Sequence, residues 1–333
     1  MSGYRDLSVA RKACAKELGS VAVGSLHRAN HFGDVATMVV VPALTITLTI
    51  LIGKVVHNPV AWIALFILQG FVFQTYQFLV HDLFLHRRVG GRWHSIFGFL
   101  YLLPLLFPYA WFHAFHMQHH KYIGSDRDTE SYKQDLDQVW KRILFLTFPG
   151  VKMAMSRRFK PAGVDDSAAA LQMTPELARR IAREKSLIRI YMLALTVAAI
   201  FVRPILIGYV LPFLIVTPIV STMRVLMEHG EANPNNLYHS GTYYRTGFVM
   251  RWLYLFELGD CHVVHHLYPA IPYYRCKDAA NRLHPFLMRN GVVERSLWQL
   301  MFGWFVQNQP HRYLWKLEPT IVVESQRVKG ANG

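Results

Sequence analysis

Long uncharged apolar stretches recur along the chain and predict helices of membrane-spanning length. Residues 35–53 and 59–80 contain no Asp, Glu, Lys or Arg, and each is long enough to cross a hydrocarbon core of about 30 Å as a helix. A third apolar region, residues 186–227, is interrupted near Arg203 and Gly208, so it has room for two crossings joined by a tight turn. The pattern therefore predicts an all-α integral membrane protein with four transmembrane helices.

One apolar segment does not fit a simple crossing. Residues 95–112 are broken by Pro104 and Pro108, and a proline inside a helix bends or ends it. We therefore expect this segment to be re-entrant or to lie along the membrane interface. Three other segments are predicted outside the spans: amphipathic interfacial helices at residues 142–155 and 247–258, the second with Trp252 and Tyr254 at the headgroup level, and a soluble connector at residues 156–180.

The composition agrees with a membrane protein and indicates its orientation. Hydrophobic residues make up 52% of the chain, and the net charge is +15. Lys and Arg are concentrated in residues 113–185 and after residue 266, whereas the loop 54–58 is short. Because cytoplasmic loops of membrane proteins are rich in Lys and Arg, we expect both termini to be cytoplasmic and the positive charge to attract anionic lipid headgroups. No interleaved basic and aromatic motif indicates a nucleic-acid partner.

Targeting and redox signals favour the cytoplasmic side as well. The first 34 residues contain several basic residues before any apolar run begins, so we expect no cleaved secretory signal peptide. The three cysteines, Cys14, Cys261 and Cys276, have no CxxC spacing. This pattern favours a reducing compartment and no disulfide framework.

Three dense groups of histidine accompany the apolar stretches: residues 81–86 (HDLFLH), 113–120 (HAFHMQHH) and 262–266 (HVVHH). A neutral imidazole ring offers a nitrogen lone pair to borderline transition metals. The groups contain no cysteine and few carboxylates, which permits iron, zinc, copper or nickel and disfavours calcium or magnesium. A structural zinc site needs only four ligands, so this many histidines indicates two metal ions.

The spacing inside each group predicts how its rings point. Positions i, i+3 and i+4 share one face of an α-helix, which brings together the three histidines of each HxxHH motif. Adjacent histidines, such as His119 and His120, diverge by about 100° and can therefore reach different metals. His81 and His86 are five residues apart and diverge by about 140° on an α-helix, which predicts that they straddle the two metals rather than chelate one.

Histidines that share one metal site must lie on one membrane face, so an even number of crossings separates each pair of groups. Two crossings between residues 120 and 262 keep this parity, provided that residues 95–112 do not cross. The sequence thus predicts four transmembrane helices with a cytoplasmic helical cap that carries a histidine-rich di-metal site.

At this point the residues resemble the membrane fatty-acid desaturase superfamily. The three histidine groups match the superfamily's three histidine boxes in order, in spacing and in position relative to the apolar stretches. The flanking residues 119–128 and 265–274 are similar too, and residues 224–229 (RVLMEH) resemble the element where many members place one more ligand. The resemblance covers about residues 35–285, which it identifies as the catalytic domain, between a cytoplasmic N-terminal segment (residues 1–34) and a C-terminal tail (residues 286–333).

The resemblance implies a non-haem di-iron centre that activates O₂ and removes hydrogen from an unactivated C–H bond of a fatty-acyl or related lipid chain. The expected reaction is desaturation, and the superfamily's alternatives are hydroxylation, carotenoid ketolation and oxidative decarboxylation to a terminal alkene. Cys261 and Val264 depart from the residues frequent in the last box and bear on substrate identity. Carried over position by position, the iron ligands are His81, His86, His116, His119, His120, His229, His262, His265 and His266.

Several residues beside the boxes are candidates to support the ligands. His113 shares the helical face of His116, and we expect a supporting or packing role for it rather than a ligand role. Carboxylates near a metal site commonly accept the outer N–H of a ligating imidazole. The candidate carboxylates are Asp82 and Glu228, which are preferred, and Asp126, Asp128 and Asp260.

Two other classes of protein can be weighed against this interpretation. A metal transporter needs metal-binding groups within its crossings, and a b-type haem protein needs facing histidines there, whereas these histidines cluster at the ends of the apolar stretches. The chain also lacks a GxGxxG segment after a strand and a cysteine set for an iron–sulfur cluster. We therefore expect a separate electron donor of the ferredoxin, rubredoxin or cytochrome b5 type, with its reductase, docked on the basic cytoplasmic surface.

Overall fold

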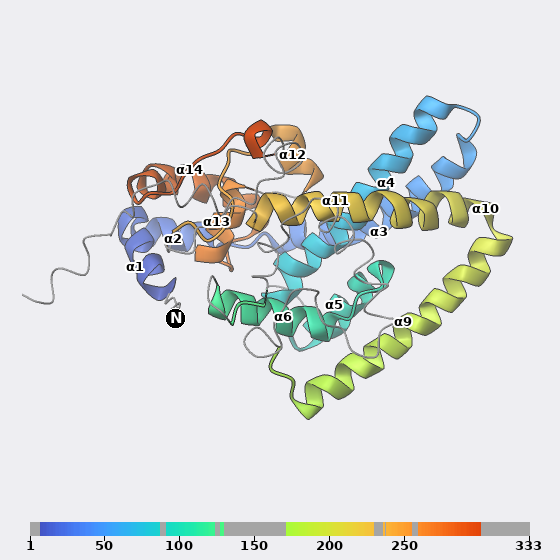
Figure 1. Cartoon of the computed structure of the whole chain (residues 1–333), viewed down its shortest axis with the longest axis horizontal. Helices are drawn as coiled ribbons and strands as arrows, with labels where there is room; N and C mark the ends of the chain where they lie inside the picture. Colours follow the sequence, from blue (N-terminus) through green and yellow to red (C-terminus); the bar gives the residue numbers. More distant parts are fainter. Residues whose placement is uncertain are drawn as a thin grey trace, which may run out of the picture.

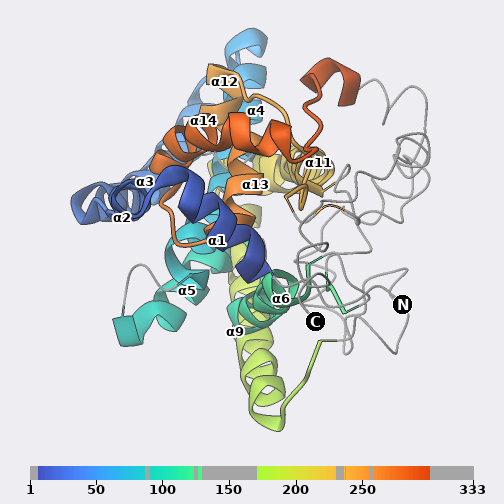
Figure 2. The same cartoon turned by 90° about the vertical axis from the view of Figure 1, so that its left-hand side faces the viewer.

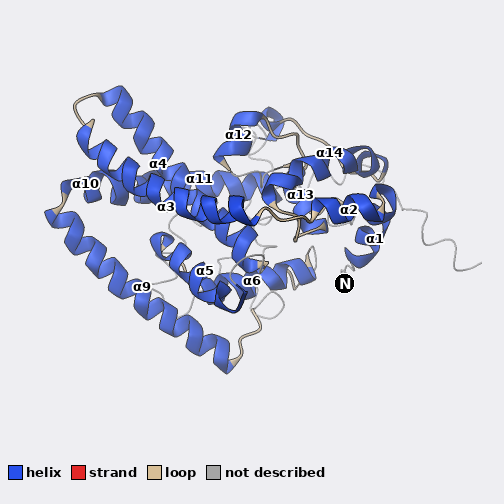
Figure 3. Ribbon diagram, turned by 180° about the vertical axis from the view of Figure 1, so that it is seen from behind, coloured by secondary structure: helices blue, strands red, loops and turns tan. Residues whose placement is uncertain are grey.

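A computed structural model describes residues 7–86, 91–123, 127–129, 171–229, 236, 238–254 and 259–300. Within these ranges the regular secondary structure is helical, without strands (Figure 3). The prediction of an all-α chain is therefore confirmed for the described residues. Several predicted features lie wholly or partly outside them: residues 1–6 of the N-terminal segment, Asp126, the interfacial helix at 142–155, residues 156–170 of the connector, residues 255–258 of the interfacial helix at 247–258, and residues 301–333 of the tail.

The helices of the two chain ends gather at one end of the molecule, and the longest apolar helices extend toward the other end (Figure 1). In the described part of the chain, η1 (Val80–Leu85) and η5 (Leu206–Val210) are π-helical, and η2 (Gly91–Trp93) and η3 (Leu103–Leu105) are 3-10 helices. The α-helices are α1 (Leu7–Leu18), α2 (Ser20–Leu26), α3 (His31–Lys54), α4 (Pro59–Leu79), α5 (His94–Leu102), α6 (Tyr109–Tyr122), α9 (Pro175–Phe201), α10 (Arg203–Ile205), α11 (Leu211–His229), α12 (Phe248–Leu253), α13 (Asp260–Leu267) and α14 (Tyr273–Arg289).

The two predicted N-terminal spans form the helical pair α3 and α4. Asn30 and Asn58 cap their N-termini, because each side chain accepts a backbone N–H at 3.1 Å, from Gly33 and Ala61 respectively. Pro59 occupies the first turn of α4, where its missing N–H costs nothing. The segments Val21–Lys54 and Pro59–Leu85 are both long and apolar enough to cross a membrane.

The third apolar region divides into two helices, as predicted. α9 ends at Phe201, Val202 is extended, and the chain restarts as α10, η5 and α11. Arg203–Ser221 is a third segment of spanning length and composition, or one of four if the bent pair α5–α6 counts as a span. α9 carries Lys185 and Arg189 close to its apolar half, so the predicted crossing there stays a prediction.

Glycines let the apolar helices approach closely. A methyl group at Gly70 of α4 would overlap Val216 of α11, and one at Gly208 of η5 would overlap the backbone of Thr49 in α3. Small residues at helix crossings are typical of membrane bundles, where they allow backbones to come together. Helices α3, α4 and α11 therefore form one packed unit, and three of the predicted ligands, His81, His86 and His229, lie at or just after the ends of α4 and α11.

The proline-containing segment bends, as predicted. The helices on either side of the break meet at 104°, and Leu106 at the corner has a left-handed φ of 56°. Such a bend fits either a broken crossing or a re-entrant segment. The prediction that residues 95–112 do not cross the membrane therefore stays a prediction.

The predicted interfacial helix at 247–258 is confirmed only in part. α12 exposes Phe248, Val249 and Trp252, as expected of a helix at an interface. Tyr254, however, is fully buried, and its hydroxyl donates to the carbonyl oxygen of Val220 at 3.4 Å. Its predicted place at the headgroup level was wrong, because the helix ends there and turns this ring toward α11.

The predicted connector at 156–180 ends earlier than expected. Thr174 caps α9 by accepting the backbone N–H of Leu177 at 3.1 Å, and Pro175 occupies the first turn. Residues 175–180 are therefore helical rather than part of a loop.

The N-terminal helices pack against the C-terminal ones. Ala10 and Cys14 of α1 are buried in the same hydrophobic core as residues of α13 and α14, and Glu17 pairs with Arg289 at 2.6 Å. Figures 1 and 2 show α1 and α2 beside α13 and α14. The described part of residues 1–34, predicted as a segment outside the catalytic domain, thus contributes to the helical cap.

Candidate metal centre

Four separate parts of the chain bring nine histidines together in one region. The turn after α4 supplies two rings, α6 supplies three, the end of α11 supplies one and α13 supplies three. Their ring nitrogens fall into groups with separations of no more than 4.8 Å. All nine histidines predicted as metal ligands therefore lie within reach of a shared site.

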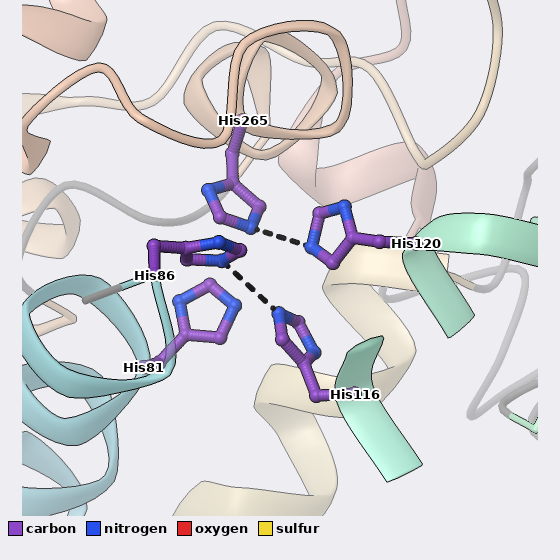
Figure 4. Close-up of side chains that lie close together, drawn as sticks. All are labelled: His81, His86, His116, His120 and His265. Carbon is purple, nitrogen blue, oxygen red and sulfur yellow. Dashed lines mark hydrogen bonds between the residues drawn. The ribbon is translucent and has the colours of Figure 1, made fainter. Parts of the chain in front are cut away.

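Five of these rings form one group, which we name the five-histidine group. The Nε2 atoms of His120 and His265 are 3.0 Å apart, and those of His86 and His116 are 3.4 Å apart. Figure 4 shows the rings arranged around a common centre, approached from η1, α6 and α13. The members are His81, His86, His116, His120 and His265.

The other four rings lie beside the first group. His119, His229 and His266 form one set, and Glu228, His229 and His262 form a second. The Nε2 atoms of His119 and His266 are 3.3 Å apart, and those of His229 and His262 are 3.1 Å apart. Because the two sets share His229, we treat these histidines as one four-histidine group with Glu228 at its edge.

Neighbouring histidines in the chain belong to different groups, as helix geometry predicts. His119 and His266 lie in the four-histidine group, whereas His120 and His265 lie in the five-histidine group. One residue turns an α-helix by about 100°, so α6 and α13 each run between the groups and supply both.

The expectation for His81 and His86 was wrong. Both lie in the five-histidine group, with ring centroids 5.5 Å apart. Val80–Leu85 is a π-helix, in which hydrogen bonds join residues i and i+5 rather than i and i+4. This wider turn brings positions 81 and 86 to one face, where an α-helix would have separated them.

The nitrogen spacing fits a metal ion in each group. Two imidazole nitrogens that bind one ion at about 2.1 Å, at an angle of about 90–110°, lie about 3.0–3.4 Å apart. The four Nε2 pairs lie at 3.4, 3.3, 3.0 and 3.1 Å. These separations are those of two ligands on one ion, so the residues present fit metal ions.

The electrostatics of the site also favour ligand chemistry. Burial lowers the pKa of His262 and His265 well below the ordinary value, and the neighbouring histidines of both groups lower it further. A lowered pKa keeps an imidazole neutral at physiological pH, so a nitrogen lone pair is available to a metal.

Residues 57–298 match the family model described as fatty acid desaturase. This chain belongs to the fatty acid desaturase family. The match confirms the resemblance drawn from the histidine boxes, and it includes all nine histidines. No curated protein matches the chain. Family membership indicates an oxidoreductase with a lipid substrate in a membrane context.

In this desaturase family member, outer contacts orient the rings of the four-histidine group. Asp128 Oδ1 lies 2.7 Å from Nδ1 of His119, and the carbonyl oxygen and Oγ of Ser240 both lie 3.1 Å from Nδ1 of His266. An acceptor on Nδ1 fixes the tautomer that presents Nε2 to a metal. Sequence reasoning ranked Asp128 below Asp82 and Glu228 and gave Ser240 no role, because only the folded chain brings residue 240 to α13.

Glu228 lies near an imidazole but does not form the predicted hydrogen bond to it. Its Oε1 is 3.9 Å from Nδ1 of His262 and accepts a hydrogen bond from Nε of Arg224 at 2.6 Å. Arg224 in turn lies over the ring of Phe78. The carboxylate is therefore held in place by a buried cation at the edge of the four-histidine group.

Asp260 contacts cations rather than imidazoles. Its carboxylate pairs with Arg251 at 3.3 Å and Lys277 at 3.1 Å and accepts the hydroxyl of Thr246 at 3.3 Å. The predicted imidazole contact is therefore not formed among the described residues. Instead, Asp260 joins the start of α13 to α12 and α14, which positions the helix that carries three histidines.

The remaining candidates lie outside the two groups. The ring of His113 packs 5.8 Å from Tyr109 and 6.3 Å from His94, measured between centroids, which agrees with a packing role. Asp82 is buried within η1 next to His81, and its role as an imidazole partner stays a prediction.

Proposed function

We propose that this protein is a membrane di-iron oxidoreductase that uses O₂ to introduce a double bond into a fatty-acyl or related lipid chain. The observation that carries the proposal is the division of nine imidazoles into groups of five and four, with adjacent histidines of α6 and α13 assigned to different groups. A division of this kind suits two metal ions a short distance apart. Family membership supports the lipid substrate.

Two iron ions, when bound, would supply the oxidising power needed to remove hydrogen from an unactivated C–H bond. The chain's own residues would bind the metal ions, orient the ligating rings and shield the site from water. The nine histidines would hold the metals, and Asp128 and Ser240 would orient two rings of the four-histidine group. His119, His229, His262 and His266 are almost fully buried, so the protein keeps bulk water away from the four-histidine group.

The proposed topology has four crossings, formed by α3, α4, the apolar half of α9, and α10–α11. Both termini and the histidine groups lie on the cytoplasmic side, because Lys and Arg are concentrated in the segments around the histidines. Exposed apolar side chains on α3, such as Val39 and Ile46, support contact of these helices with lipid.

Electrons would come from a separate ferredoxin, rubredoxin or cytochrome b5-type donor and its reductase. Exposed cations on α1 and α14, among them Lys16, Arg275 and Arg282, support docking of an acidic carrier on the cap.

The test is lipid and hydrocarbon profiling by mass spectrometry in cells that express the chain together with a functional electron donor. The expected result is new double bonds in acyl chains, absent when the variant His265→Ala, His266→Ala is expressed. The matched control is His57→Ala, which removes an exposed histidine in the loop between α3 and α4. A terminal alkene one carbon shorter than the acyl chain would identify the reaction as decarboxylation, and an added oxygen would identify it as hydroxylation. No histidine-dependent change in any lipid would contradict lipid oxidation.

A further inference from the structure

Helix α13 carries three of the nine histidines although it is only 8 residues long. An isolated helix of this length has little stability in water, so tertiary contacts must hold it. All of its residues are buried, and Asp260 ties its first turn to α12 and α14. Its last turn needs partners as well, because the final carbonyl groups of a helix have no intrahelical donor.

Arg11 of α1 supplies these partners. Its Nε donates to the carbonyl oxygen of Leu267 at 2.7 Å, and its Nη2 donates to that of His266 at 3.4 Å. In return, the hydroxyl of Tyr268 donates to the carbonyl oxygen of Arg11 at 2.8 Å. A guanidinium group at this position also suits the negative end of the helix dipole.

The rest of α1 keeps Arg11 in place. Ala10, the residue directly before Arg11, is fully buried in the hydrophobic core that α1 shares with α13 and α14. Farther along the helix, Cys14 is buried in the same core and Glu17 pairs with Arg289 of α14. The family match begins at residue 57, so this helix lies outside the matched region.

We propose that α1 is a clamp on the metal centre, with Arg11 as a positioning residue. By binding the last carbonyl groups of α13, Arg11 fixes the backbone from which His265 and His266 project. His265 belongs to the five-histidine group and His266 to the four-histidine group. Contacts from the one arginine therefore stabilise a ligand of each group. The proposal rests on the proposed function to the extent that metal ions occupy the two groups.

The test measures metal retention in the purified full-length protein. Protein loaded with iron(II) is mixed with a chromophoric iron chelator, and the release rate and the iron content per chain are recorded. Arg11→Gln removes the charged donors and is expected to release iron about tenfold faster than the wild type, since loss of outer contacts around metal sites typically costs 10–100-fold in affinity. Arg11→Lys keeps a cation that can reach one carbonyl group and is expected to restore most of the retention.

Lys12→Gln is the matched control, because Lys12 is exposed on the same helix and should leave the release rate unchanged. If Arg11→Gln does not fold, Tyr268→Phe, which removes one hydrogen bond to Arg11, is expected to give a smaller acceleration. Equal release from the wild type, Arg11→Gln and Tyr268→Phe would overturn the clamp, and so would equal acceleration by Lys12→Gln or a failure of Arg11→Lys to restore retention. Wild-type protein that binds no iron would overturn both this inference and the proposed function, whereas iron-loaded wild type with an unchanged Arg11→Gln rate overturns the clamp alone.

Discussion

Asp128 lies 2.7 Å from Nδ1 of His119, and both side chains are almost fully buried. The carboxylate follows α6 closely in the chain, so the helix that carries His119 and the segment that orients its ring are neighbours in sequence. With Nδ1 engaged, Nε2 of His119 faces Nε2 of His266 across 3.3 Å. This contact therefore sets the direction in which one ring enters the four-histidine group.

The variant Asp128→Asn tests this relationship. Asparagine keeps the shape of the side chain but removes the negative charge that favours an N–H at Nδ1, so we expect iron affinity to fall by about 10–100-fold. Equilibrium competition with a chelator of known affinity measures the change. Asp278→Asn is the control, because Asp278 pairs with Arg282 on the exposed side of α14. An unchanged affinity in Asp128→Asn would show that the contact does not support a metal ligand.

Single-histidine variants of α13 test the division into two groups. His265→Ala removes one ring from the five-histidine group, and His266→Ala removes one from the four-histidine group. Each variant should lose mainly the ion of its own group, so that dialysis leaves about one iron per chain in each and none in the double variant. Metal analysis gives the stoichiometry, and Mössbauer spectra of ⁵⁷Fe-loaded protein show which iron signal is lost. Loss of the same signal in both variants would contradict the assignment.

The sequence was sufficient for features that depend on local periodicity. Two uncharged stretches predicted α3 and α4, and the HxxHH spacing predicted that His119 and His120 reach different groups. Both follow from the length of an apolar run and the rotation of an α-helix, which any window of the chain contains.

Features that depend on contacts distant in the chain were missed. The π-helical turn after α4 changes the direction of His86, and nothing in HDLFLH distinguishes it from an α-helix. The cations that pair with Asp260 come from α12 and α14, and Ser240 reaches His266 from a separate segment. Tyr254 suits an interface by residue type, yet packing against α11 buries it. The last three cases are decided by tertiary contacts rather than by local preference.

Gly208 offers a test of the packing between the apolar helices. Any side chain there would overlap the backbone of Thr49 in α3, and overpacking of this kind costs about 1–3 kcal/mol. Gly208→Ala should therefore lower the free energy of unfolding in detergent by that amount, as measured by thermal or denaturant unfolding. Gly24→Ala is the control, because a methyl group at Gly24 of α2 meets no atom within 4 Å. Equal stability of the two variants would show that α3 and η5 do not approach so closely.

The buried side chain of His239 is expected to make the stability of the folded protein depend on pH. Its side chain is buried, and burial, with a smaller contribution from Arg295, lowers its pKa from 6.5 to about 3. Below about pH 6.5 this ring is protonated in the unfolded chain but stays neutral in the folded protein. The free energy of unfolding therefore falls as the pH drops from 6.5 toward 3, by up to about 1.4 kcal/mol per pH unit for this group. Gln at this position cannot titrate, so His239→Gln should lose stability less steeply than the wild type between about pH 6 and pH 4. Denaturant unfolding of both iron-free proteins across this range measures the two slopes, and identical slopes would mean that His239 is protonated in the folded protein.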